Sequence, residues 1–309
     1  MGGERGEKGT VGAMPVPPAS LPSGLDAPAF TVGDAMARGV TLRRLRARDL
    51  AAPFRGARTR EAVEEFESRA RALYPLLSVD QVLSHTTAAT LHGLPLPRRG
   101  EDGPLHVTTL GGGRAMRRDG VVGHRAEARA VEMVRGLSAT SPLATWCDLA
   151  TMLPLDDLIA VGDSLVRRKG PIATTSELVA AVEACQGRGV RRLREALALV
   201  RPNTDSARET LLRLATVRAG FPEPIPNMPI RNEFGVVIAH GDLVWPAEKV
   251  VLEYEGEQHA TDPRQFAIDI ERINELEDLG WRVIRVDRVL FSTRATLFAR
   301  LDRALRLPR

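Results

Sequence analysis

Apolar positions in residues 29–60 recur at helical spacing, and threonines stand where helices can begin. Thr31 can cap a short helix that Gly39 ends, and Thr41 can cap a second helix over the segment TLRRLRARDL. The apolar positions of the second helix are Leu42, Leu45 and Leu50. A short extended piece around Phe54 follows. This pattern predicts a winged helix-turn-helix over residues 29–60.

The pattern over residues 61–200 mixes helices with strands. A helix is expected over about 61–76. The segments LHVTTL (105–110) and VVGHRA (121–126) predict strands. Several amphipathic helices follow, and the first of them begins at Pro142. Residues 61–200 are therefore expected to form a mixed α/β middle domain.

The histidines and cysteines of this middle region give no metal-binding signature. His85 and His92 are seven residues apart, two helical turns, so they can share a face. Without a third ligand beside them, we expect core or capping histidines. Cys147 and Cys185 have no metal-ligand spacing and are expected to be reduced thiols, as is usual in a cytoplasm.

From about Asn203 the pattern alternates between helix and strand. The order of elements is predicted to be α-β-β-(β)-α-β-α, and a fragment that starts near Pro202 is expected to fold by itself. The expected helices cover about 205–219, 263–279 and 293–306, and the clearest strands cover 236–245, 249–256 and 281–287.

Composition places few limits on the class of protein. Residues 1–28 are rich in Gly, Pro and Ala and are expected to form a disordered tail. The apolar content of 43% is enough for real cores in 309 residues. No run approaches 18 apolar residues and no secretory signal opens the chain, so we expect a cytoplasmic protein without membrane spans.

Charge is unevenly distributed along the chain. Residues 29–60 hold eight arginines and two aspartates, a net charge of +6, whereas residues 203–309 have a net charge of −2. A basic element beside an acidic one suggests a module that binds a polyanion such as DNA. The expected DNA contacts are Arg43, Arg44 and Arg46 on the second helix and Arg55 in the wing. The alternative is a solvated basic helix that packs on its neighbour.

Acidic residues gather where two strands of the C-terminal part are expected to pair. If the loop at 246–248 closes a hairpin, opposed residue numbers sum to 493 or 495, and Asp242 lies diagonal to or directly opposite Glu253. Glu255 and His240 share that face, and Glu209 on the preceding helix could complete the cluster. Such acids repel one another unless a cation such as Mg²⁺ binds them. Alternatively they are surface acids, or they pair with arginines such as Arg285.

The same segment resembles a known family. Glu209, GDLVWP (241–246), EYEGEQH (253–259) and DIERINELEDLGWRVIRVD (269–287) resemble the Vsr-like (very-short-patch-repair-like) domains of the PD-(D/E)XK nuclease superfamily. The resemblance covers about 203–307. It implies a restriction-endonuclease-like αβββαβα core over 203–309, within a chain of the α/β (α+β) class.

The resemblance also implies roles for particular residues. Metal-dependent hydrolysis of a phosphodiester would use Asp242 and Glu253 as ligands of Mg²⁺ or Mn²⁺, with Glu209 as the acid of the first helix. Glu255 occupies the place of the usual lysine and is expected beside the metal. His259 is expected to act as general base or acid, or else to cap the helix that starts near Asp262. Arg272 is expected to form an exposed pair with Asp269 or to touch phosphate.

The region before Asn203 is similar to the AbiEi antitoxin family. The similarity rests on the Arg-rich unit, on SHTTAATLHGLPLP (84–97), on HVTTL (106–110) and on TSPLATWCDLA (140–150). It implies a winged-helix head and a mixed domain, without catalytic residues. We therefore expect a metal-dependent DNA endonuclease with a DNA-binding head. The alternatives are an antitoxin-like, non-catalytic DNA-binding regulator with a relic nuclease fold, and an interaction scaffold.

Overall fold

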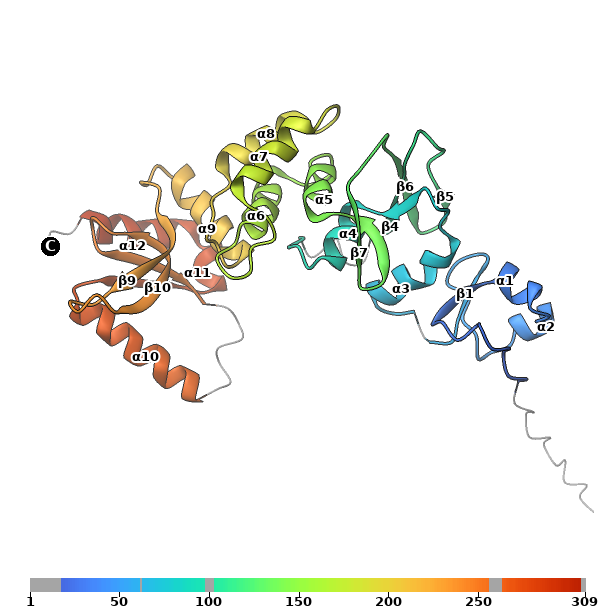
Figure 1. Cartoon of the computed structure of the whole chain (residues 1–309). Helices are drawn as coiled ribbons and strands as arrows, with labels where there is room; N and C mark the ends of the chain where they lie inside the picture. Colours follow the sequence, from blue (N-terminus) through green and yellow to red (C-terminus); the bar gives the residue numbers. More distant parts are fainter. Residues whose placement is uncertain (1–17, 62, 98–102, 256–262, 307–309) are drawn as a thin grey trace, which may run out of the picture. The chain divides into compact units, whose positions relative to one another are not determined.

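The chain divides into two compact units, Met1–Ser78 and Val79–Arg309 (Figure 1). The structure is a computed structural model that describes residues 18–61, 63–97, 103–255 and 263–306, with the backbone alone for 263–270. Both units combine helices with strands, so the expected α+β class is confirmed. Within the described residues, none of the helices has the length and hydropathy that crossing a bilayer requires.

The first unit contains the two predicted helices and a two-stranded sheet. Thr31 caps α1 by accepting a hydrogen bond from the Asp34 backbone N–H at 2.9 Å, and Thr41 caps α2 through the Arg44 N–H. Gly39, with φ of 82°, makes the turn between them. The elements are β1 (Ala29–Thr31), α1 (Val32–Ala37), α2 (Leu42–Leu45), β2 (Ala57–Thr59), α3 (Phe66–Leu73) and the 3₁₀ turn η1 (Tyr74–Leu76).

Several details of the first unit differ from the prediction. Helix α2 ends at Leu45, and the extended strand is β2, which pairs antiparallel with β1. The expected tail of residues 1–28 is only partly described, and Leu25 of its described part is buried in the core of this unit. Helix α3 also belongs here, so the unit ends at Ser78 and not at residue 60.

The second unit begins with a six-stranded sheet in the order β5-β6-β4-β3-β8-β7. The two predicted strands LHVTTL and VVGHRA correspond to β4 and β6, which pair in parallel, and α4 packs against β4. The elements are β3 (Gln81–Leu83), α4 (His85–Leu91), β4 (Leu105–Thr109), β5 (Arg117–Arg118), β6 (Val121–Arg125), β7 (Val131–Val134) and β8 (Leu137–Thr140).

A helical layer follows this sheet and encloses the largest apolar cluster of the unit. Trp146 is fully buried at its centre, and its indole N–H donates to the Leu158 carbonyl at 2.9 Å. Leu214, which belongs to the next helix α9 (Ala207–Arg218), also packs in this cluster. The layer consists of α5 (Pro142–Leu149), α6 (Leu155–Leu165), α7 (Thr175–Ala184) and α8 (Val190–Leu199).

A four-stranded sheet in the order β12-β11-β10-β9 forms the last part of the chain. Strands β9, β10 and β11 pair antiparallel, and β12 pairs parallel with β11. With α9 in front, the elements follow the predicted order. They are β9 (Ile225–Arg231), β10 (Val237–Trp245), β11 (Val250–Tyr254), α10 (Pro263–Asp278), β12 (Arg282–Val286), α11 (Arg288–Ser292) and α12 (Arg294–Arg306).

Helices cover both faces of this sheet (Figure 1). Leu243 and Leu252 are opposed across β10 and β11, and they pack with residues of α9, α11 and α12. Val244 and Val251 point the other way, where Leu276 of α10 packs on them. In β11, Val251 therefore faces α10 and Leu252 faces the opposite side, as the period of a β-strand requires.

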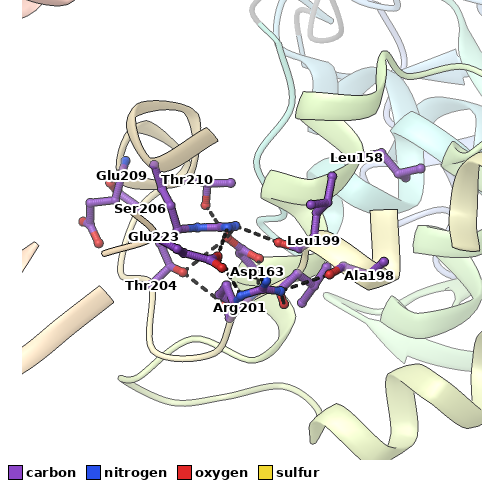
Figure 2. A network of polar contacts seen from close by, with 12 residues as sticks. Leu158, Asp163, Ala198, Leu199, Arg201, Thr204, Ser206, Glu209, Thr210 and Glu223 are labelled. Atoms are coloured by element: carbon purple, nitrogen blue, oxygen red, sulfur yellow. Dashed lines mark hydrogen bonds and ion pairs between the residues drawn. The ribbon is translucent and has the colours of Figure 1, made fainter. Parts of the chain in front are cut away.

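Helix α9 is attached to the helical layer by a buried ion pair (Figure 2). Asp163 on α6 accepts from the Arg213 guanidinium at 3.0 Å, from Thr210 Oγ1 at 2.8 Å and from the Arg201 N–H at 2.7 Å. Burial raises the pKa of the Asp163 carboxyl, and these donors oppose that shift. Arg213 also donates to the Leu199 carbonyl.

This attachment changes the domain boundary that the sequence suggested. Leu214 and Arg213 pack with the helical layer, while Leu212 packs with the last sheet. A fragment that starts at Pro202 would lose Asp163, the buried charge partner of Arg213, and leave Arg213 with Glu223 alone, which is 41% exposed. The predicted boundary at 200–203 thus separates α9 from one of the two cores that share it.

We expect the Arg213→Met variant to lose about 3–5 kcal/mol of unfolding free energy, because it leaves the Asp163 carboxyl buried without a counter-charge. The double variant Asp163→Asn/Arg213→Met should lose clearly less, since the unpaired charge is gone. Arg191→Met is the control, as Arg191 is 93% exposed. Urea unfolding measures all three, and equal losses in the single and double variants would show that the ion pair does not hold α9.

Candidate metal centre

Asp242 occupies the point where the pairing of β10 with β11 ends. The described ladder stops at Leu243 opposite Leu252, a register that sums to 495. At the next position the Asp242 carboxylate accepts a hydrogen bond from the Tyr254 backbone N–H at 2.8 Å. A Cβ at the neighbouring Gly241 would meet methyls of Val244 and Val251 at 2.7 Å, so glycine fits the packing of this strand. The sequence thus determines the position of this carboxylate through a strand and a short hairpin.

Glu253 faces the same side of the sheet, toward α10. It follows Val251 at the period of the strand and is only 8% exposed. Its Oε2 lies 3.0 Å from Nη2 of Arg272, which α10 contributes. The side chain of Asp269 lies outside the described residues, so the expected pair of Arg272 with Asp269 stays a prediction. Arg272 lies one helical turn before Leu276, on the side of α10 that faces the sheet.

Glu209 approaches from the first turn of α9. Ser206 caps the helix by accepting from the Glu209 N–H, and the side chain then folds back toward the sheet. Its Oε2 accepts from the Asp205 N–H at 2.9 Å and from Asn227 Nδ2 at 2.7 Å. Asn227 is a buried residue of β9 with φ of 47°. Sequence reasoning missed Asn227, although an asparagine between prolines in a strand is a visible signal.

The acids interact electrostatically, and the effect is seen in the pKa of Asp242. Burial, together with the charges of Glu209 and Glu253, raises the pKa of Asp242 to about 7. Burial is also the main reason why the pKa of Glu209 is raised. The Tyr254 N–H and Arg272 oppose the shift at Asp242. A buried carboxyl with such a pKa near other acids is typical of functional sites, and a bound cation would favour its charged form.

Glu255 does not join this group. The Glu255 carboxylate forms an ion pair with Arg285 on β12, the alternative that the sequence had left open. This pair lies beside a cavity of about 440 Å³, whose other walls include Asp287 and Arg300. His259 lies outside the described residues.

The acids are close enough to interact but are not arranged around one point. In the described part of the chain, three ligand atoms that all lie within 4.8 Å of one another are found on His85, His106 and His124, and not on the acids. Like charges separate unless a cation stands between them, and here Arg272 provides a cation at Glu253. Asp242 and Glu253, with Glu209 behind, nevertheless supply the hard oxygen donors that Mg²⁺ and Mn²⁺ prefer.

The arginines of the first unit have two different roles. Arg44 forms a bidentate pair with Asp49 at 2.9 and 2.7 Å and also donates to the Ala19 carbonyl, so it holds the fold and is not an open DNA contact. Arg58 donates to the Leu45 carbonyl in the same way. The exposed arginines of this unit include Arg38, Arg43, Arg46, Arg48 and Arg55.

Comparison with known proteins identifies relatives without an assigned activity. No protein-family model matches the chain. It is similar to two uncharacterized proteins of Mycobacterium tuberculosis, MT2308 of strain CDC 1551 / Oshkosh and Rv2248 of strain ATCC 25618 / H37Rv, each 28% identical over 202 residues, 65% of this chain and 72% of the relative. A crystal structure of the RV2827C protein from Mycobacterium tuberculosis aligns at 18% identity with a TM-score of 0.40, over 66% of this chain and 83% of that one.

The raised pKa of Asp242 predicts how stability depends on pH in metal-free protein. Its folded pKa of about 7 exceeds the ordinary 3.8, so its contribution is fully present below pH 3.8 and is lost as the pH rises through 7. The free energy of unfolding should fall by up to about 1.4 kcal/mol per pH unit in this window. Urea unfolding of wild type and Asp242→Asn at several pH values isolates the contribution. The same slope in both proteins, with Glu255→Gln as control, would contradict the raised pKa.

Proposed function

We propose that the chain is a DNA endonuclease that uses Mg²⁺ or Mn²⁺ held by Asp242 and Glu253. The observation that carries the proposal is the set of buried acids on neighbouring elements, with the pKa of Asp242 raised by burial and by Glu209 and Glu253. Buried acids that raise one another's pKa are costly to the fold, and a divalent cation removes that cost.

The topology supports the same proposal. Three antiparallel strands are followed by a helix and a strand parallel to the third, which agrees with the αβββαβα core implied by the Vsr-like resemblance. The acids stand on the elements that the resemblance assigns to them: Glu209 on the preceding helix, Asp242 on the middle strand and Glu253 on the next.

Within this proposal each side chain has a definite task. Asp242 and Glu253 hold the cation, and the Tyr254 N–H fixes the Asp242 carboxylate through its Oδ2. When bound, the ion supplies Lewis acidity and lowers the pKa of a coordinated water. Glu209, oriented by Asn227, adds negative charge behind Asp242. Arg272, which pairs with Glu253, would be the cation available to a phosphate, in place of the lysine that the superfamily usually has at the position of Glu255.

The first unit supports DNA as the polyanion. Helix α1, the turn at Gly39 and α2 form a helix-turn-helix outline, and the pair β1–β2 stands in the place of a wing. Exposed Arg43 and Arg46 at α2 and Arg55 before β2 can bind phosphates, because such contacts need long cationic side chains open to solvent.

One observation favours the non-catalytic alternative. Arg272 neutralises Glu253, and Arg285 neutralises Glu255, so two of the acids already have cationic partners. A DNA-binding regulator with a relic nuclease fold would retain these ion pairs permanently. Cleavage assays separate the two functions, since the regulator binds DNA but never cuts it.

The decisive variants are Asp242→Asn and Glu253→Gln, which keep side-chain shape and remove the charge that holds the cation. Incubated with plasmid and Mg²⁺ or Mn²⁺, each should nick DNA about 100-fold more slowly than wild type, or worse, with unchanged DNA binding. Glu255→Gln is the matched control and should retain most of the activity, because Glu255 pairs with Arg285. If wild type nicks no DNA with either metal, the regulator is the correct function.

The DNA-binding head has its own test. Arg43→Ala/Arg46→Ala should weaken binding and reduce the slope of log K against log salt concentration by about 1.8, as each lost phosphate contact removes about 0.9. Arg191→Ala, another exposed arginine, should leave the slope unchanged. Fluorescence anisotropy at several salt concentrations measures the slopes. An unchanged slope in the double variant would move the DNA-binding surface elsewhere.

A further inference from the structure

Three histidines meet on one face of the six-stranded sheet, far along the sequence from the acids. His106 is on β4 and His124 on β6, and the parallel register places Thr108 opposite His124. His106 and Thr108 point to the same face, because they are two residues apart on one strand. His85 begins α4, which packs on β4. Sequence reasoning considered His85 only with His92, which bonds the Thr140 carbonyl instead.

The ring nitrogens of these histidines converge. One ligand atom from each lies within 4.8 Å of the other two. His106 Nδ1 is 2.8 Å from His124 Nε2, and the His85 ring lies over the His124 ring with centroids 3.6 Å apart. Residues from three separate elements thus place imidazole nitrogens at one location.

The surroundings orient the rings and keep them neutral. His85 Nδ1 is 3.0 Å from Ser84 Oγ, which accepts from Thr108 Oγ1, so Nε2 of His85 is left for another partner. Burial, aided by the neighbouring histidines, lowers the pKa of His85 to about 2 and that of His106 to about 4, and burial lowers that of His124. The nearby Arg129 is paired with Asp148 at 2.8 Å. At neutral pH the rings are therefore neutral, the form that binds metal ions.

We propose that His85, His106 and His124 form a binding site for one transition-metal ion of the Zn²⁺ class. Imidazole nitrogens select Zn²⁺ and its neighbours over Mg²⁺. Ligands about 2.05 Å from a tetrahedral ion are roughly 3.4 Å apart, so His106 and His124 must separate by only about half an ångström. His124 is half-buried, and its open side supplies both this movement and a fourth position for solvent. The site is independent of the proposed nuclease centre.

The test uses the full chain after treatment with a chelator. Titration with Co²⁺ should give one ion that Zn²⁺ displaces but millimolar Mg²⁺ does not, with visible d–d absorption and no thiolate band. His124→Asn should lower the affinity for Co²⁺ at least 100-fold. Even the loss of a side chain that only hydrogen-bonds to a metal ligand commonly lowers metal affinity 10- to 100-fold. His240→Asn and Asp242→Asn should keep the signal, which separates this site from the acids. Circular dichroism checks that each variant is folded.

A second measurement needs no variant. Histidine ¹⁵N shifts of wild type should change for three rings when Zn²⁺ is added, because one nitrogen of each ring would bind the ion. The proposal is contradicted if these shifts do not change when Zn²⁺ is added and instead show a proton shared between nitrogens of His106 and His124. That outcome, or full Co²⁺ binding by folded His124→Asn, would show that the histidines form a buried hydrogen bond and no metal site.

Discussion

The buried pair of Arg213 with Asp163 determines the position of helix α9, and the geometry of the acids depends on α9 (Figure 2). Both side chains are 1% exposed, so the cost of desolvating two charges is met only if hydrogen bonds satisfy them. Asp163 accepts hydrogen bonds from the Arg201 N–H and from Thr210 Oγ1, which lie before and after residue 203. These bonds attach α9, which packs on the last sheet, to the helical layer. One turn before Arg213, Glu209 is thereby directed toward Asn227 and Asp242.

The acids themselves act against the stability of the fold. An apolar residue at position 242 would suit a strand next to Leu243 and Val244, yet the position holds a carboxyl whose pKa is raised to about 7. Arg272 relieves part of the repulsion at Glu253. Local departures of this kind from core chemistry are expected at functional sites, where another partner completes the electrostatics. On our account that partner is a divalent cation, and Arg272 is its substitute in the metal-free protein.

The sequence predicted features that depend on residues close along the chain, such as strand register. It did not predict contacts that depend on how distant elements pack. Hairpin length and strand period placed Asp242 beside Glu253, because the register of a hairpin follows from its turn. The same reasoning could not give the Arg272–Glu253 contact, which depends on how α10 lies on the sheet. The histidine cluster was missed for the same reason: His85, His106 and His124 meet only once α4 packs on β4 and β4 pairs with β6. The boundary near residue 203 failed because periodicity does not reveal that α9 serves two cores.

The most direct measurement of the central claim is anomalous diffraction from crystals of the full chain soaked in Mn²⁺. The account predicts a peak between the Asp242 and Glu253 carboxylates, at roughly 2.1 Å from an oxygen of each, the spacing of small divalent ions. Arg272 should then have left Glu253. Anomalous density absent from this position, with Arg272 still paired to Glu253, would contradict the account.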